Sequence, residues 1–168
     1  MEMNTPRTHK ESIDVARIGA RQVAEHRDGI TLLGPMIWSL RQAGLMTPEK
    51  AMTPGSMAWQ GGRDYALAGY ASARAFGWLA SDDNERTTQV ATGRLWVRLQ
   101  LAASALGVAM QPHSQTLQEY AEMDALRAEM RRAACVADGK TLQMLFRVGY
   151  AKPAGPSPRR PLDSFVTV

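Results

Sequence analysis

An apolar stripe at helical spacing runs through the first thirty residues. The stripe consists of Ile13, Ala16, Ala20 and Val23, and Arg17, Arg21 and Glu25 occupy the other side. This spacing predicts one amphipathic helix. The Asp28-Gly29 pair is a turn signal and is expected to end it.

A second stripe predicts another helix, which ends near Gly44. Its members are Leu33, Met36, Ile37 and Leu40. The start of another helix is predicted at Thr47-Pro48-Glu49, because proline is well tolerated at the first helical position. Residues 53–62, which contain a proline and several glycines, are expected to form a loop.

Two segments predict longer strands. Residues 73–80 are apolar, carry Phe76 and Trp78 on alternate positions and run into a turn-forming cluster at 81–84, which predicts a buried strand. Residues 142–150 alternate between large apolar and small or polar side chains, which predicts a second strand. Residues 108–110 can form a very short third strand.

The second half of the chain also contains two helical patterns. Residues 85–106 are apolar nearly all round from Leu95 onward, which predicts a central, largely buried helix ending at Gly107. Residues 116–134 return to an amphipathic stripe, formed by Leu117, Tyr120, Met123, Leu126 and Met130. The proline-rich tail from Lys152 onward excludes a helix or an inner strand there.

Helices dominate this inventory, and the fold class that fits is α+β, with helices packed around a small mixed or antiparallel sheet. Three strands are few for 168 residues, which indicates that a partner for the sheet lies outside this chain.

Composition excludes several function classes. The chain is 45% hydrophobic and 21% charged, as in ordinary globular proteins. Its net charge of +4 is scattered along the sequence, so we expect no nucleic-acid partner. The single cysteine, Cys135, excludes an intrachain disulfide. No run approaches the roughly 20 apolar residues of a membrane span, so a soluble, cytoplasmic protein is expected.

The sequence does not favour a metal site, a serine nucleophile or a reactive cysteine. The three histidines, His9, His26 and His113, are far apart and have no cysteine or acid at ligand spacing, so no metal site is expected. His113 precedes Ser114, but no nucleophile-elbow motif surrounds the serine. Cys135 lies at an alanine-rich helix end, where packing is the expected role.

Two spaced segments carry a family resemblance. They read GRLWVRLQLAASALGVAMQPHSQTLQE at 93–119 and QMLFRVGYAKPAGPSPRRPL at 143–162. Taken in this order they resemble the C-terminal half of the FMN-dependent nitroreductase family, in its Acg-type branch. The resemblance divides the chain into a flexible leader at 1–10, a partial nitroreductase-like domain at 11–152 and a Pro/Arg-rich tail at 153–168.

The resemblance implies FMN bound at a homodimer interface. It implies electron or hydride transfer from NAD(P)H through FMN to a nitroaromatic or quinone-type acceptor. Arg159 and Arg160 fall where family members hold the FMN phosphate, and forked guanidinium donors suit a phosphate dianion. The alternative for these two residues is a solvated basic tail.

A second set of cofactor residues also follows from the resemblance. Pro112, His113, Ser114 and Gln115 match the turn that lies against the flavin ring, where polar groups tune its electron affinity. The alternative is a plain connection between a strand and a helix, with Ser114 or Thr116 as the helix cap. No catalytic residue is assigned.

The resemblance leaves out the family's N-terminal Arg- and Ser-rich element, which grips the FMN phosphate; residues 1–30 contain no such motif. Three hypotheses follow. The chain is an FMN-dependent oxidoreductase whose missing half comes from a second chain, a flavin-binding or flavin-sequestering protein without turnover, or a noncatalytic remnant that dimerises through its exposed apolar surface.

Overall fold

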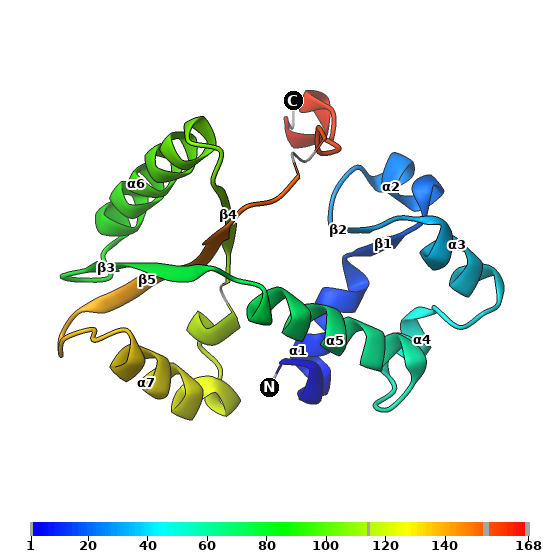
Figure 1. Cartoon of the computed structure of the whole chain (residues 1–168), viewed down its shortest axis with the longest axis horizontal. Helices are drawn as coiled ribbons and strands as arrows, with labels where there is room; N and C mark the ends of the chain where they lie inside the picture. Colours follow the sequence, from blue (N-terminus) through cyan, green and yellow to red (C-terminus); the bar gives the residue numbers. More distant parts are fainter. Residues whose placement is uncertain (1, 114, 153–154, 167–168) are drawn as a thin grey trace. The chain divides into compact units, whose positions relative to one another are not determined.

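The computed structural model describes residues 2–113, 115–152 and 155–166 (Figure 1). It is 53% helical and 16% strand, which confirms the α+β class and the small antiparallel sheet. The chain divides into two compact units, Met1–Leu67 with Ala154–Val168, and Ala68–Pro153. We call them the N-terminal and C-terminal units.

The N-terminal unit contains a two-stranded parallel sheet and short helices. Its elements are η1 (Glu2–Asn4), α1 (Pro6–Asp14), β1 (Ala16–Ile18), α2 (Ala20–His26), β2 (Ile30–Leu32), α3 (Pro35–Gln42), α4 (Pro48–Met52), most of α5 (Met57–Ala71) and η4 (Leu162–Phe165). Helix α1 begins within the stretch expected as a leader.

The single helix expected over the first apolar stripe is wrong, because β1 interrupts it. Residues 16–18 pair with 30–32 of β2 in parallel register, and Ile18 is buried there. Gly19 follows at φ +89°, a conformation that side-chain-bearing residues rarely adopt, and separates β1 from α2. The apolar spacing fits a helix equally well, so the pairing with a distant strand decides the outcome.

The core of the N-terminal unit is small. Val23 of α2 is buried, as is His9 of α1, whose Nε2 atom lies 2.9 Å from the carbonyl oxygen of Ala51 in α4. The side chain of Arg17 is 16% exposed and donates from Nε and NH2 to Asp28 Oδ1 at 3.1 and 3.0 Å. Because only Ile18 and Val23 are buried apolar residues in the described part of this unit, these polar contacts contribute to holding its elements together.

The next two predicted helices are confirmed. Helix α3 ends before Gly44, whose φ is +64°, and α4 begins at Pro48 with Thr47 as its cap. The loop expected over 53–62 is wrong in its second half, where α5 begins at Met57. Ser56 explains this start, because its Oγ accepts a hydrogen bond from the Trp59 amide at 3.1 Å.

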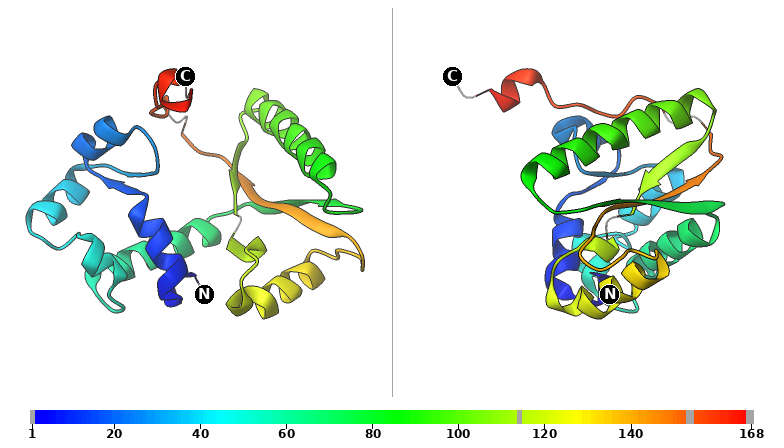
Figure 2. Two further views of the ribbon diagram at one scale, coloured as in Figure 1. Left: turned by 180° about the vertical axis from the view of Figure 1, so that it is seen from behind. Right: turned by 90° about the vertical axis from the view of Figure 1, so that its left-hand side faces the viewer.

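The C-terminal unit is a three-stranded antiparallel sheet with helices on both sides (Figures 1 and 2). The strand order is β3 (Ala75–Ser81), β5 (Thr141–Gly149) and β4 (Ala109–Pro112), so all three predicted strands are confirmed. Helix α6 (Arg86–Ala105) covers one face, and α7 (Asp124–Ala133) lies on the other side.

The core of this unit forms along the central strand. Leu142, Leu145 and Phe146 of β5 are buried, and the Phe146 ring meets Trp96 of α6 at a centroid distance of 5.1 Å. The Phe146 ring also covers Gly77 on β3, where an added Cβ would lie 2.6 Å from its Cε2 and Cζ atoms. The missing side chain at position 77 therefore makes room for the ring.

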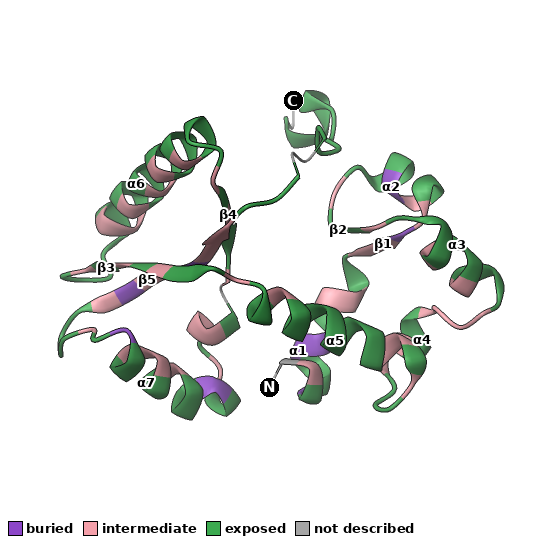
Figure 3. Cartoon of the chain, viewed as in Figure 1, coloured by how far each residue is buried: buried purple, intermediate pink, exposed green. Residues whose placement is uncertain are grey.

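The expected burial of α6 and β3 is wrong, as Figure 3 shows. Phe76 and Trp78 are exposed, and Leu101 on the outer side of α6 is 66% exposed. A single helix against a three-stranded sheet can bury only one of its sides. The apolar residues on the other side stay uncovered within this unit.

The helix expected over 116–134 is confirmed only in its second part. Two short 3-10 turns, η2 (Gln115–Leu117) and η3 (Ala121–Met123), precede α7, and Tyr120 between them has extended backbone angles. The Arg127 guanidinium donates to the carbonyl oxygen of Gln118 at 3.1 Å. A continuous helix would have used that oxygen for a backbone amide, so this side chain supports the break.

Helices in the described part of the chain are too short, or not apolar enough, to cross a lipid bilayer. Within the same residues, no grouping of three or more His, Cys, Asp or Glu side chains could hold a metal ion.

Candidate functional site

The turn that follows β4 is anchored to the centre of the sheet. Pro112 pairs with Phe146 at the end of β4, and the amide of His113 donates to the Leu145 carbonyl oxygen at 2.8 Å. These contacts fix where the chain leaves the sheet. Ser114, a candidate flavin contact, lies outside the described residues.

The His113 ring packs against an aromatic neighbour from α5. Its centroid lies 4.5 Å from that of Tyr70, with the planes tilted by 38°. Burial lowers the pKa of His113 below the usual 6.5, and the positive charge of Arg147 lowers it further. The ring is therefore neutral at pH 7, with one nitrogen as donor and the other as acceptor.

Polar atoms of this turn are buried without a hydrogen-bond partner in the described part of the chain. They include His113 Nε2, Thr116 Oγ1 and Gln118 Oε1. Gln115 begins η2 between them. Buried polar atoms are normally paired, so each of these three atoms has unused capacity for a hydrogen bond.

The two arginines of the tail belong to the N-terminal unit and are exposed there. Arg159 NH1 donates to the carbonyl oxygen of Pro158 at 3.3 Å. The Arg160 guanidinium lies 4.4 Å from the centroid of the Phe165 ring, and its Nε is 3.8 Å from Asp28 Oδ2. The Asp28 carboxylate therefore pairs with Arg17 through Oδ1, and Arg160 lies near Oδ2.

Pro112, His113 and Gln115 thus lie in one anchored turn of the C-terminal unit. In the N-terminal unit, Arg160 lies near Asp28 and Phe165, and Arg159 donates to the carbonyl oxygen of Pro158. Each set is described within its own unit, and all of these residues stay predicted cofactor contacts.

Residues that the sequence alone did not single out contribute to both arrangements. Tyr70 and Arg147 surround His113, and Asp28 faces Arg160. Arg147 interrupts an otherwise apolar or uncharged strand, which is the signal that could have drawn attention to it. The sequence predicts Asp28 only as part of a turn.

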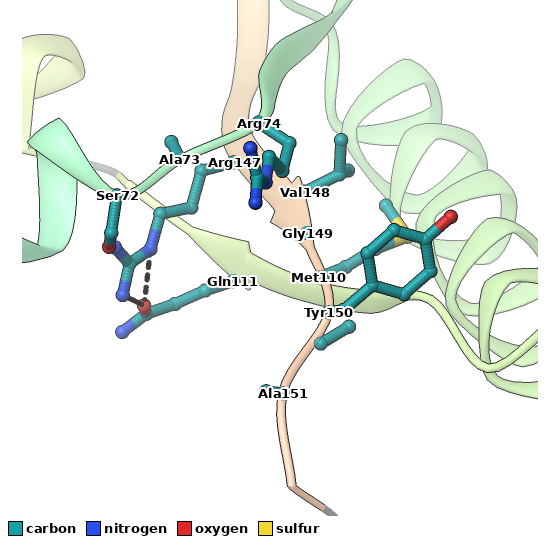
Figure 4. A pocket seen from close by; sticks show the side chains of 11 residues that line it. Ser72, Ala73, Arg74, Met110, Gln111, Arg147, Val148, Gly149, Tyr150 and Ala151 are labelled. Carbon is teal, nitrogen blue, oxygen red and sulfur yellow. Dashed lines mark hydrogen bonds between the residues drawn. The ribbon is translucent and has the colours of Figure 1, made fainter.

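A pocket of about 550 Å³ opens where β4 begins and β5 ends, next to the residues that lead into β3 (Figure 4). Its lining combines polar and apolar side chains, with Ser72, Arg74, Gln111 and Arg147 in the first group and Met110, Val148 and Tyr150 around them. Both Nε and NH2 of Arg147 donate to Gln111 Oε1. No acidic side chain belongs to this lining.

Comparison with models of known protein families gives no match, and neither does comparison with curated proteins or with solved structures. Local geometry and the chemistry of individual residues are therefore the basis for assigning a function.

Proposed function

We propose that this protein binds FMN and acts as a nitroreductase-like oxidoreductase, in which electrons pass from NAD(P)H through FMN to a nitroaromatic or quinone-type acceptor. A second chain completes the site in this proposal. The proposal starts from the resemblance of residues 93–119 and 143–162 to the C-terminal half of that family.

The observation that carries the proposal is the turn after β4. His113 Nε2, Thr116 Oγ1 and Gln118 Oε1 are buried and unpartnered within the described residues. A flavin ring presents both hydrogen-bond acceptors and a donor along one edge, so its chemistry matches a mixed set of this kind. The neutral His113 ring adds a group that can donate or accept without bringing a charge against the flavin.

The phosphate of FMN would be held by Arg159 and Arg160. Both side chains are exposed, and the only hydrogen bond described for the Arg159 side chain is to the neighbouring carbonyl of Pro158. Guanidinium groups bind phosphate through paired, charge-assisted hydrogen bonds. FMN, when bound, supplies a ring that accepts a hydride and passes electrons on.

A homodimer is part of the proposal, and the outer side of α6 supports it. Val90, Val97 and Leu101 recur on that side at helical spacing and are 49%, 53% and 66% exposed. An apolar stripe of this length on a helix usually packs against another surface. A second copy of the chain would cover it and would bring a second set of site residues.

Flavin retention tests the proposal directly. The purified full-length protein is mixed with FMN, unbound FMN is removed, and the visible absorption spectrum is recorded. We expect retained flavin absorbance that is lost in the double variant Arg159→Ala, Arg160→Ala. A folded protein that retains no flavin would refute the proposal and would favour the noncatalytic alternative.

A matched control separates phosphate recognition from a general loss of positive charge. Arg21→Ala, Arg132→Ala removes two exposed arginines, one from α2 and one from the last turn of α7, and should leave flavin retention unchanged. Consumption of NADPH with a nitroaromatic acceptor then separates turnover from binding alone. Retained flavin without NADPH consumption would support the flavin-binding protein without turnover.

A further inference from the structure

The pocket at the start of β4 and the end of β5 has the chemistry of a second binding site. Every residue of its lining belongs to the C-terminal unit, whereas Arg159 and Arg160 belong to the N-terminal unit. Its volume of about 550 Å³ is within the range of small-molecule sites. The side chains around it determine which molecule fits.

Two guanidinium groups enter this pocket without a carboxylate to balance them. Arg147 is held by Gln111, a neutral acceptor, through a hydrogen bond of 2.8 Å from Nε and a second one from NH2. No hydrogen bond or ion pair within the described residues engages the Arg74 guanidinium. Both guanidinium groups are positively charged, so an anion in the pocket would be attracted to each of them.

Two glycines lie against the arginine side chains, and one of them makes room for Arg147. An added Cβ at Gly69 would lie 3.0 Å from Arg147 NH1, so a larger residue there would press on the guanidinium. At Gly149 an added Cβ would lie 3.7 Å from Arg74 Cγ, which shows that the arginine stem runs over the strand at this point. The backbone thus positions both side chains at the same sheet end.

The rest of the lining is suited to a flat apolar group. The Tyr150 ring is 82% exposed, and Met110 lies close to it in the pocket wall. Figure 4 shows Arg147 with Ser72 and Gln111 to the left of β5, the Arg74 side chain close to the strand, and the Tyr150 ring to its right. Aromatic and thioether side chains pack well on planar rings.

We propose that this pocket binds a phosphate monoester of a small aromatic molecule, with the phosphate between Arg74 and Arg147 and the ring against Tyr150. The charges favour phosphate over carboxylate, because two guanidinium groups match a dianion whereas a single one suffices for a carboxylate. Ser72 and the side-chain amide of Gln111 add neutral hydrogen-bonding groups to the lining. None of the proposed FMN contacts belongs to the lining of this pocket.

Phenyl phosphate is the probe, and its binding to the full-length protein is measured by isothermal titration calorimetry. We expect Arg74→Gln and Arg147→Gln each to weaken binding by about tenfold or more, as for the loss of a charge-assisted hydrogen bond. Arg98→Gln is the matched control: it removes one exposed arginine from α6 of the same unit, outside the pocket, and should leave the affinity unchanged. Equal losses in all three variants would overturn the proposal.

Further measurements test the aromatic ring and the phosphate group of the ligand separately. Tyr150→Leu should weaken phenyl phosphate and leave inorganic phosphate unaffected, and phenol should not bind. Benzoate that binds as tightly as phenyl phosphate would overturn the assignment to phosphate. Circular dichroism and thermal unfolding check each variant for folding, and Arg147→Lys keeps the charge in case Arg147→Gln unfolds.

The double variant Arg159→Ala, Arg160→Ala separates this proposal from the FMN proposal. It should retain phenyl phosphate binding in full, whether or not the protein retains flavin. Loss of phenyl phosphate binding in a folded protein with these two substitutions would overturn the second site, and so would a wild-type protein that does not bind phenyl phosphate.

Discussion

The ring of Phe146 lies directly over Gly77 on the neighbouring strand, so that a Cβ at position 77 would come within 2.6 Å of two ring atoms. Gly77→Ala should therefore force the ring of a buried residue to move. We expect a loss of about 1–3 kcal/mol in the free energy of unfolding, which is typical of overpacking. Urea unfolding followed by Trp fluorescence measures it, since Trp96 contacts the same ring.

An alanine substitution at Gly93 in α6, in the same unit, is expected to have the opposite effect on stability. Apart from its chain neighbours and the backbone of its own helix, no described atom lies within 4 Å of a Cβ added at Gly93, whose backbone is helical. Gly93→Ala should stabilise the protein by about 0.5–1 kcal/mol, because glycine loses more backbone freedom in a helix than alanine does. An unchanged or raised urea midpoint in Gly77→Ala would refute the packing of Phe146 on Gly77, and a lowered midpoint in Gly93→Ala would refute the second expectation.

His113 should make stability depend on pH. Its pKa in the folded protein is lowered by burial and by Arg147, whereas in the unfolded chain it is near 6.5. The unfolded state therefore binds a proton more readily, and stability falls as the pH is lowered from about 6.5 through the folded-state pKa. His113→Gln should reduce the difference in melting temperature between pH 7 and pH 5. His26→Gln, at an exposed position on α2, is the control and should leave this difference unchanged.

Thr47 caps α4, and its Oγ1 accepts from the Lys50 amide at 3.3 Å. Thr47→Ala should cost about 1 kcal/mol, as for other caps, and the loss should appear first in the short helix itself. Amide hydrogen exchange at residues 50–52 is the measurement. Thr47→Ser, which keeps the hydroxyl, should restore the protection, and a lack of rescue would argue against capping.

Asp28 holds Arg17 firmly and lies near Arg160. Asp28→Asn leaves the largely buried Arg17 without a carboxylate, and we expect a loss of about 1–3 kcal/mol in the free energy of unfolding. The same change removes an anion that competes with phosphate for Arg160. Under the FMN proposal, flavin retention should therefore rise in this variant as long as it remains folded.

Asp64→Asn is the control for that prediction. Asp64 pairs with Arg63 beside it, and both side chains are about half or more exposed, at 62% and 48%. Exposed pairs contribute little to stability, so both the free energy of unfolding and flavin retention should stay as in the wild type. A rise in flavin retention in both variants would indicate a nonspecific effect of net charge.

The sequence predicted the elements whose patterns are local. The alternation over 142–150 and the Thr47-Pro48 start each specify a structure through neighbouring residues, and both are confirmed. β1 and β2 were missed because three-residue strands carry no periodicity of their own and depend on each other for pairing. Ser56 as a cap was missed because a glycine pair follows it closely.

Burial and the surroundings of the candidate site could be predicted less well. The pattern of α6 is apolar nearly all round. Such a pattern fits a buried helix, and it fits equally well a helix with one apolar side exposed for contact with another protein surface. Arg147 meets Gln111 from 36 residues away, and only the register of β4 on β5 brings them together. Contacts of this kind depend on strand pairing, which a single sequence does not specify.

The order of strands in the C-terminal unit has a consequence for how the protein is made. β5 pairs with both β3 and β4, yet it is the last of the three to leave the ribosome. Until it emerges, β3 presents Phe76 and Trp78 on a strand without its hydrogen-bonded neighbour. Nascent chains in this state expose an edge that other chains can pair with. Chaperone binding during synthesis should therefore concentrate on the interval between the emergence of β3 and that of β5.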